Sequence, residues 1–352
     1  MLERLEVLAV DASVTNRASS VLAAGEEPLL SVKDLEVFFR HGRDWLRVID
    51  GVSFDVAPSE TIGIVGESGS GKTVTGLTIL GLLPQGLART TGEIRFQGED
   101  INGLPESDMR LIRGRRISMI FQEPMTALDP VFTVGEQIAE TLRTHTGCSP
   151  KEARDRAIEA LIQVGISLPK QRADEYPHQL SGGMRQRVMI AIALACEPSL
   201  LIADEPTTAL DVTIQAQIIE LLLELVQARG TSLIFISHNL GVVAQCCTRM
   251  VTMYAGQVVE SGEVDEVLEH PLHPYTSGLL RSMPSLARHG ARLASIGGRV
   301  PPPDEMPTGC HFQPRCAHAL PACGEPQALL RSGTRDVRCV RFPELKLPGV
   351  LA

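Results

Sequence analysis

The sequence lacks any apolar run long enough to cross a membrane. Its longest run, Val188 to Cys196, falls far short of the ~20 residues that a spanning helix needs. The N-terminus also lacks the pattern of a secretory signal, because Glu3, Arg4 and Glu6 come too early and the following apolar run is too short. These absences predict a cytoplasmic chain whose role at a membrane depends on partners.

The sequence is short of positive charge as well. Its 33 Lys and Arg residues stand against 42 Asp and Glu, for a net charge of −9. An acidic surface argues against sequence-independent nucleic-acid binding as the main role. The one basic cluster is interpreted as a solvated rim beside a strand. It consists of Arg110, Arg113, Arg115 and Arg116.

A glycine-rich segment, Gly66 to Thr73, fits the phosphate-binding pattern G-x-x-x-x-G-K-[ST]. Thr61 to Val65 before it predicts a buried strand, and Val74 to Leu83 after it predicts a helix. Glycines let backbone N–H groups turn toward phosphate oxygens, and a helix N-terminus adds its positive dipole end. Lys72 would reach the β- and γ-phosphates, and the Thr73 hydroxyl would bind Mg²⁺. The residues expected to bind nucleotide are Gly66, Glu67, Ser68, Gly69, Ser70, Gly71, Lys72 and Thr73.

Two alternating apolar segments before this loop predict a small antiparallel β layer beside the nucleotide. They are Leu35 to Phe39 and Val52 to Val56, joined by a loop at His41 to Leu46. An aromatic side chain in this layer would stack on adenine. Phe39 and Trp45 are the candidates, and packing of either in the core is an equal alternative.

The middle of the chain predicts an all-helical insert over residues from about 125 to 180. It follows a predicted strand at Ile117 to Phe121 that ends in Gln122. Within it, Ser149, the next proline and Glu152 form an N-terminal capping pattern. The apolar stripe of the helix that follows comprises Ala157, Ile158, Leu161 and Ile162.

Strands and helices alternate around and after this insert, which predicts a parallel sheet with helices on both faces. Ser199 to Ala203 predicts a strand that ends in Asp204 and Glu205, and Ser232 to Ser237 predicts one that ends in His238. Ligands bind at the carboxyl ends of such strands. These side chains, Gln122 and the glycine-rich loop are therefore expected to converge.

The chemistry of that convergence fits phosphoryl transfer to water, which needs a phosphate cradle, a metal ion, a base and charge stabilisation. Asp204 is the expected Mg²⁺-associated carboxylate, and Glu205 would polarise the attacking water. Gln122 would contact the metal and the water, and His238 would hydrogen-bond the γ-phosphate. A helix-start pair or a simple cap would explain each residue singly, but not the whole set in this order.

In this order the motifs resemble those of ABC ATPases over roughly residues 29 to 285. The signature-like segment reads Leu-Ser-Gly-Gly-Met-Arg-Gln. The matching segments are Gly66–Thr73 (Walker A), Gln122 (Q-loop), Leu180–Gln186 (signature), Leu200–Pro206 (Walker B with the catalytic Glu205), Ala209–Asp211 (D-loop) and His238 (switch histidine).

The resemblance implies an α/β fold of the P-loop NTPase (ABC ATPase) type, with an antiparallel β layer, a helical subdomain and a Cys-containing C-terminal extension. The expected parts are a flexible tail at 1–27, an ATPase domain at 28–270 with its helical subdomain at about 125–195, and the extension at 271–352. Two such domains would form a head-to-tail dimer around ATP, and the helical insert and Gln122 would couple it to membrane subunits. Ser181, Gly182 and Gly183 would bind the γ-phosphate of ATP held by the other subunit.

Four further segments are similar to the oligopeptide/dipeptide branch of ABC importers. They are Gly81–Pro84, Phe121–Pro130, His273–Thr276 and Gly309–Cys316. That resemblance implies import of peptides powered at the cytoplasmic face of the membrane. The implied partners are a sister ATPase, two permeases and an extracytoplasmic solute-binding protein. Some relatives carry nickel or other small solutes, so such a solute is the alternative.

Two rival interpretations fit the sequence less well. Soluble ABC ATPases that act on DNA or ribosomes usually carry two ATPase domains, a long coiled coil or a basic face, whereas this chain has one P-loop, one signature and an acidic balance. A non-hydrolytic nucleotide sensor would have lost Glu205 or His238, and both are present.

Four of the eight cysteines crowd the C-terminal segment, with the spacing C-x5-C-x6-C-x15-C. Many prolines leave little regular structure there, so something other than secondary structure is expected to hold the segment together. Disulfides are disfavoured in the cytosol, whereas four thiolates suit a [4Fe–4S] cluster or structural zinc. The lack of C-x2-C pairs and similar tails in the family favour the cluster, with zinc or no metal as alternatives. The expected ligands are Cys310, Cys316, Cys323 and Cys339.

Overall fold

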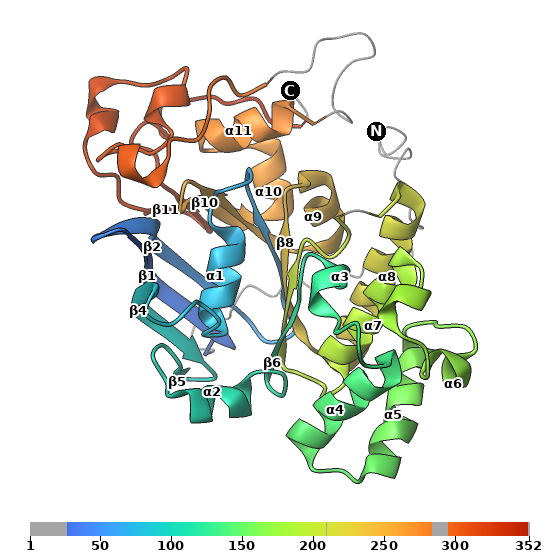
Figure 1. The fold of residues 1–352 in the computed structure, drawn as a ribbon. Coiled ribbons are helices and arrows are strands. Elements are labelled where there is room, and N and C mark those ends of the chain that lie inside the picture. Colours follow the sequence, from blue (N-terminus) through green and yellow to red (C-terminus); the bar gives the residue numbers. More distant parts are fainter. Residues whose placement is uncertain (1–26, 209, 284–294, 351–352) are drawn as a thin grey trace.

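The computed structural model describes residues 27–208, 210–283 and 295–350. The tail expected at residues 1–27 therefore lies outside the described residues, except for Glu27. Two sheets and the helices around them form the molecule (Figure 1). No helix in these three ranges is long and apolar enough to cross a membrane.

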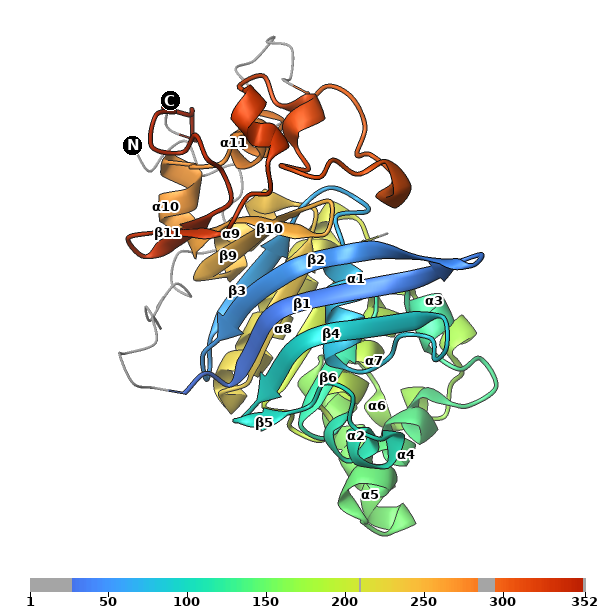
Figure 2. The ribbon, with the colours of Figure 1, turned by 90° about the vertical axis from the view of Figure 1, so that its left-hand side faces the viewer.

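The smaller sheet is the predicted antiparallel layer, with the strand order β2-β1-β4-β5 (Figure 2). β1 and β2 form a hairpin, so the loop expected at His41 to Leu46 is only a tight turn. The strands are β1 (Leu30–His41), β2 (Asp44–Val56), β4 (Ala88–Phe96) and β5 (Glu99–Asp100).

The larger sheet has the strand order β11-β12-β10-β9-β3-β8-β7-β6. Its β9, β3, β8, β7 and β6 strands are parallel, as predicted, and β10, β12 and β11 continue it with antiparallel pairs. The strands are β3 (Thr61–Val65), β6 (Ile117–Ile120), β7 (Leu200–Asp204), β8 (Ser232–Ser237), β9 (Arg249–Tyr254), β10 (Gln257–Glu263), β11 (Leu330–Ser332) and β12 (Arg335–Val337).

The helices begin and end largely where the sequence supplies caps. The Ser149 hydroxyl accepts the N–H of Glu152, and the Asp211 carboxylate caps α8 in the same way. The helices are α1 (Lys72–Ile79), α2 (Glu106–Ile112), α3 (Pro124–Ala127), α4 (Val134–Thr146), α5 (Pro150–Gln163), α6 (Pro169–Arg172), α7 (Gly182–Leu194), α8 (Val212–Arg229), α9 (Leu240–Cys246), α10 (Val264–Glu269) and α11 (Pro274–Arg281).

Three details of the sequence interpretation are wrong. The first helix ends at Ile79 rather than Leu83, because Gly81 has φ 61° and donates its N–H to Thr78, three residues back, rather than to the helical partner four residues back. Ile162, placed in the apolar stripe of α5, is 57% exposed, because the buried stripe follows the four-residue spacing of Ala153, Ala157 and Leu161 and Ile162 falls outside it. Phe121 lies beyond the end of β6 and is exposed, and the four residues of β6 are all buried rather than alternating.

The helical insert and the C-terminal extension occupy opposite ends of the molecule. In Figure 1, α4 and α5 of the insert (green) lie far from the extension (orange to red). α1 lies between the two sheets, where its Ile79 joins a core cluster with residues of β1, β2 and β3. The glycine-rich segment at the start of α1 therefore lies between the helical insert and the C-terminal extension.

The extension has more regular structure than its prolines predicted. It adds β11 and β12 to the edge of the larger sheet, and Val337 of β12 pairs with Glu260 of β10. Three single-turn 3₁₀ helices lie between its loops: η5 (Pro303–Glu305), η6 (Gln313–Arg315) and η7 (Pro321–Gly324). An aromatic cluster then packs it on β9, with ring centroids of Tyr254, Tyr275 and Phe312 4.7 to 5.3 Å apart.

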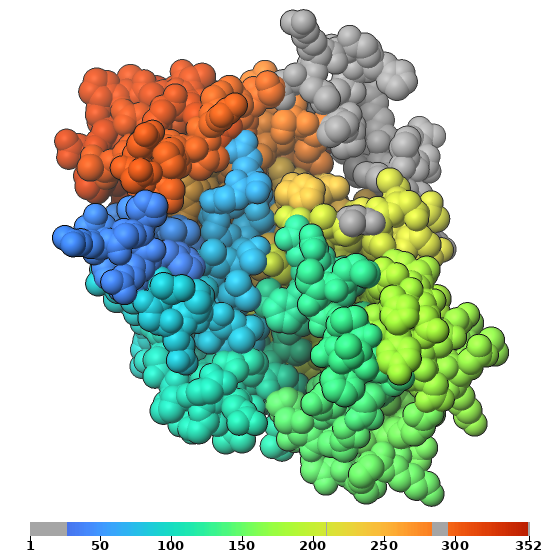
Figure 3. Space-filling view, in the orientation of Figure 1, coloured from blue at the N-terminus to red at the C-terminus, as the bar shows by residue number. Residues whose placement is uncertain are grey.

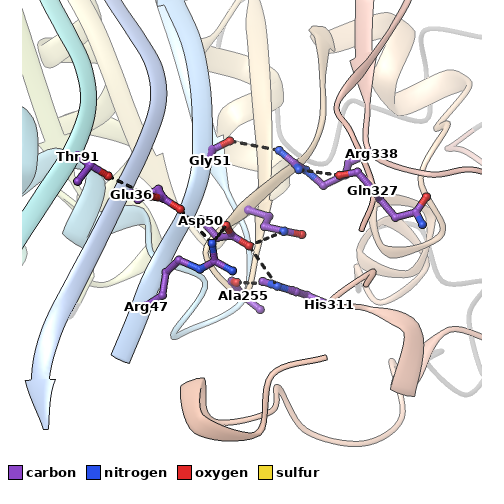
Figure 4. Close-up of polar contacts among 10 residues, drawn as sticks. Glu36, Arg47, Asp50, Gly51, Thr91, Ala255, His311, Gln327 and Arg338 are labelled. Carbon is purple, nitrogen blue, oxygen red and sulfur yellow. Dashed lines mark hydrogen bonds and ion pairs between the residues drawn. The ribbon is translucent and has the colours of Figure 1, made fainter. Parts of the chain in front are cut away.

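The extension is also tied to the antiparallel layer by polar contacts around Asp50 of β2 (Figure 4). One Asp50 oxygen accepts from Gln257 at 2.8 Å and lies 3.4 Å from His311 Nε2, and the other pairs with Arg47 at 2.8 Å. Nearby, Arg338 donates to the carbonyl of Gly51 at 3.2 Å. The extension is therefore seated on the antiparallel layer.

One buried ion pair fastens the added strands to the sheet, and its loss should destabilise the fold. Arg335 of β12 pairs with Glu260, whose carboxylate is fully buried and also accepts the N–H groups of Leu272 and His273. Arg335→Ala should lower the free energy of unfolding by about 3 kcal/mol, because it leaves a buried carboxylate without its cation. Urea or thermal unfolding measures this loss.

The matched control is Arg331→Ala, which removes a solvent-exposed arginine–carboxylate pair with Asp336 from the same hairpin. Its effect should stay within about 0.5 kcal/mol. Equal effects of the two variants would show that the Glu260 pair adds nothing beyond a surface contact.

Candidate active site

The glycine-rich loop between β3 and α1 adopts a conformation that two of its glycines make possible. Gly66 has φ 156°, and a Cβ there would lie 2.2 Å from the carbonyl oxygen of Met253. Gly71 caps α1 with φ 100°, and a Cβ there would lie 2.5 Å from the Ile49 side chain. Larger residues are therefore excluded at both ends of the loop. Figure 3 shows this light-blue segment reaching the surface between the orange extension and the green insert.

Lys72, the first residue of α1, folds its side chain back over the loop. Its Nζ donates to the carbonyls of Gly66 at 2.8 Å and Glu67 at 3.0 Å. Burial lowers the pKa of Lys72, and the carboxylates of Glu205, Asp204 and Glu67 oppose that shift. A buried cation inside a backbone loop is suited to binding an anion such as phosphate.

Thr73 and Asp204 meet at the ends of neighbouring elements. The Thr73 hydroxyl donates to Asp204 Oδ1 at 3.1 Å. Burial raises the pKa of Asp204, and the hydrogen bond from Thr73 opposes that shift. A hydroxyl and a carboxylate oxygen are ligands that Mg²⁺ prefers, so the pair has the donor chemistry expected for that ion.

Glu205 lies at the centre of a polar network built from three strand ends. Its carboxylate accepts from Gln122 Nε2 at 3.2 Å and Thr208 Oγ1 at 2.8 Å, and lies 3.2 Å from His238 Nδ1. Burial raises the pKa of Glu205, but the bonds from Thr208 and His238 outweigh it and leave the pKa lowered. The group is therefore an ionised acceptor at neutral pH.

The backbone of Glu205 is in the left-handed region, with φ 45°. A residue with a side chain rarely adopts that conformation, and such strain clusters at functional sites. Its N–H donates to the carbonyl of Ile236 on β8, which holds the turn against the neighbouring strand. Sequence reasoning missed both this strain and the contact from Thr208. The Walker B segment, Leu200–Pro206, gives no sign of a positive φ and ends before Thr208.

The signature segment begins helix α7. The Ser181 hydroxyl caps α7 by accepting the N–H of Met184, and Gly182 and Gly183 form the first turn. Among the described residues, no hydrogen bond or ion pair links Ser181, Gly182 or Gly183 to the P-loop of the same chain. Their assignment to ATP held by a second subunit stays a prediction.

The two aromatic candidates have different surroundings. Phe39 is half-buried and packs against the core cluster of the antiparallel layer. The Arg89 guanidinium lies 5.0 Å from the Trp45 ring centroid and 4.4 Å from that of Phe38. Arg89 therefore already covers a face of Trp45, whereas Phe39 has no such cation over it among the described residues.

Three arginines of the predicted basic rim, Arg110, Arg113 and Arg115, line a groove. Arg113 pairs with Glu106 and Arg116 with Glu99, as solvated surface pairs do. The groove, of about 760 Å³, runs between α2, β6 and α4. Its lining combines the basic side chains with exposed apolar ones and includes Arg110, Arg113, Arg115, Leu82, Leu111 and Phe121.

The four tail cysteines line a single pocket of about 10 Å³ and form no disulfide. Burial raises the pKa of the Cys310 thiol to about 11, and burial also raises the pKa values of Cys316 and Cys339. Sulfur-rich donors fit a thiophilic metal chemically. Within the described ranges, however, no group of three or more His, Cys, Asp or Glu residues is arranged to hold a metal ion, so the geometry gives the predicted cluster no support.

Two residues of the extension that sequence reasoning missed contact the P-loop directly. Arg315 forms an ion pair with Glu67 across 248 positions of the chain, and the Tyr275 hydroxyl accepts the N–H of Glu67. The motif Gly309–Cys316 contains Arg315, but nothing in it indicates where the tail docks. Only the fold brings these residues to the site.

Comparison with known proteins matches two parts of the chain to described families. Residues 49–208 match the ABC transporter family, and residues 259–323 match the C-terminal region of oligopeptide/dipeptide transporters. The oligopeptide transport ATP-binding protein AppD of Bacillus subtilis is 50% identical over 90% of this chain and 97% of its own length. The dipeptide transport ATP-binding protein DppD of Haemophilus influenzae is 50% identical over 88% and 94%.

Solved structures agree with this assignment. The ATP-binding cassette MJ0796, in a dimeric post-hydrolysis state bound to ADP and Pi, superposes with a TM-score of 0.59 and 28% identity, over 67% of this chain and 98% of that one. CbiO1 from Clostridium perfringens, part of an ABC transporter complex, gives a TM-score of 0.58 and 27% identity, over 69% and 91%. With the motifs, the fold and these relatives in agreement, the chain belongs to the ABC transporter ATPases, in the oligopeptide/dipeptide importer family.

Proposed function

We propose that this chain is the ATP-hydrolysing subunit that powers import of di- and oligopeptides across the cytoplasmic membrane. The observation that carries the ATPase part is the meeting of Lys72, the Thr73–Asp204 pair and Glu205 at one edge of the larger sheet. The peptide part rests on the relatives' names and on the matched C-terminal region.

Each site residue has a proposed role. Glu205 activates the attacking water, and His238, 3.2 Å from it, contacts the γ-phosphate. Thr73, Asp204 and Gln122 would hold Mg²⁺, which would neutralise the negative charge that develops on the phosphates. Phe39 stacks on adenine. The P-loop residues Gly66, Glu67, Ser68, Gly69, Ser70, Gly71, Lys72 and Thr73 hold the phosphates.

The proposed assembly contains a sister ATPase, two permeases and an extracytoplasmic solute-binding protein, with this chain at the cytoplasmic face of the membrane. Ser181, Gly182 and Gly183 complete the sister's ATP site. The proposed ATPase domain spans 28–270, with its helical subdomain at about 125–195, and the extension spans 271–352. The basic and apolar groove between α2 and α4 suits a cytoplasmic segment of a permease, because it offers both a hydrophobic floor and cations.

The four tail thiols are proposed to bind a [4Fe–4S] cluster, with zinc as the alternative. The support is chemical and not geometric: four cysteines line one pocket without a disulfide, and cysteine thiolates are the usual ligands of such a cluster. Cysteines bind such metals as thiolates, so loading would have to reverse the raised pKa values of these thiols.

Lys72→Ala should abolish ATP turnover, because the phosphates lose their main counter-charge. The measurement uses the assembled transporter in proteoliposomes, with ATP hydrolysis followed as peptide-loaded binding protein is added. The parent should respond to di- or oligopeptides and the variant should not. Normal turnover in the variant would remove the P-loop from the mechanism, and a response to nickel but not to peptides would overturn the proposed solute.

Glu205→Gln should keep ATP binding but slow hydrolysis by about 10²-fold or more, since an amide is a poor proton acceptor. The closed dimer should then accumulate with ATP, which size-exclusion chromatography detects. A variant that hydrolyses at the parent rate would take Glu205 out of the base role.

Cys316→Ser should lower the metal content of the tail, because it removes one of four proposed thiolates. Iron, acid-labile sulfide and zinc are measured on anaerobically purified protein. Cys148→Ser, a change outside the pocket, is the control. Matching iron and sulfide in the parent would support the cluster, zinc would support a structural metal site, and neither metal would refute both.

A further inference from the structure

The second residue of the P-loop, Glu67, is held by the C-terminal extension. Arg315 Nη1 donates to Glu67 Oε2 at 2.6 Å, and Nη2 donates to Oε1 at 3.1 Å. The pair is bidentate, and the Arg315 side chain is only 5% exposed. Charge-assisted fork-to-fork contacts of this kind fix direction as well as distance.

The backbone of Glu67 is fixed at the same time. Its N–H donates to the hydroxyl of the fully buried Tyr275 at 2.8 Å, and its carbonyl accepts from Lys72. A single loop residue thus joins α11, η6 and the lysine that is proposed to hold phosphate. Displacement of Glu67 would shift the Lys72 ammonium with it.

Arg315 is itself positioned before any ligand binds. Its Nε donates to the carbonyl of Gly297 at 2.9 Å, and Nη2 also reaches the carbonyl of Ile296 at 3.3 Å. Nη1 lies 3.4 Å from the Tyr254 hydroxyl, and the guanidinium lies 5.7 Å from the Tyr254 ring centroid. Because its orientation is already fixed, little conformational entropy is lost in holding Glu67.

Electrostatics gives this contact a role in nucleotide binding. A carboxylate inside a phosphate-binding loop repels a polyanionic ligand, and the Glu67 charge already acts on Lys72. A buried guanidinium paired with that carboxylate cancels the repulsion locally. Without it, ATP would have to bind beside an unpaired negative charge.

We propose that Arg315 is a positioning residue of the ATP site, which neutralises and orients Glu67 so that the P-loop accepts the phosphates of ATP. The extension is then a part of the nucleotide site and not only an appendage on the sheet. This inference rests on the proposed binding of ATP at the P-loop.

Arg315→Ala tests it, with Mg-ATP titrated against the full-length chain in a binding assay and against the assembled transporter in a turnover assay. The Kd and KM for ATP should rise about tenfold while kcat changes less than about twofold, because the lost interaction favours bound ATP and the transition state alike. Arg331→Ala removes an exposed pair from the same extension and should leave both constants unchanged. Unchanged Kd and KM in Arg315→Ala would overturn the proposal.

A second pair of variants separates this role from a purely structural one. If Arg315 acts through the Glu67 charge, removing it after Glu67→Gln should change KM less than about twofold relative to Glu67→Gln alone. If Arg315 only anchors Gly297 and Ile296, its removal should raise the KM for ATP by the same factor with Glu67 and with Glu67→Gln. That result would contradict the proposal. Arg315→Lys should lie between parent and Arg315→Ala, since lysine keeps the charge but not the fork.

Failure of this inference is distinguishable from failure of the proposed function. A parent chain that binds Mg-ATP, a Lys72→Ala variant that does not, and an unaffected Arg315→Ala variant would refute only the role of Arg315. A parent chain that binds no Mg-ATP would refute the site itself. Thermal unfolding of each variant shows whether a change in KM reflects binding or loss of fold.

Discussion

The register of three parallel strands is the constraint on which the site depends. β3 lies between β9 and β8, and β8 lies between β3 and β7, so their carboxyl ends meet at one edge. Val65 pairs with Ser237 and Asp204 with Ile236, which brings the P-loop, the Asp204–Glu205 turn and His238 together. Because side chains alternate along a strand, a slip of one residue would turn Asp204 away from Thr73.

Local chemistry explains why so much of this could be predicted from the sequence. The P-loop pattern, the short apolar strands and the caps at Ser149 and Asp211 are each contained within a few neighbouring residues. Parallel topology then follows from their alternation, and strand ends converge by geometry. The fold class and the grouping of Lys72, Asp204 and Glu205 needed no knowledge of distant contacts.

Two of the contacts that were missed join distant parts of the chain. The Glu67–Arg315 pair spans 248 positions and the Tyr275 contact spans 208, and both depend on how the extension docks. The positive φ of Glu205 has no residue signal, since glutamate has no special tolerance for such a value. Exposure of Ile162 likewise depends on which neighbours cover α5.

The network around Glu205 limits how the site can work. Gln122, Thr208 and His238 all contact its carboxylate in the described arrangement. In the proposed role, Glu205 must accept a proton from water, and the hydrogen bonds from Thr208 and His238 that lower its pKa make it a weaker base. Gln122 is the donor that leads into the helical insert, at the junction of β6 and α3, so a shift of the insert would change the hydrogen bonding of Glu205 directly. A physical route thus links the part of the chain proposed to meet the permeases with the residue proposed to activate water.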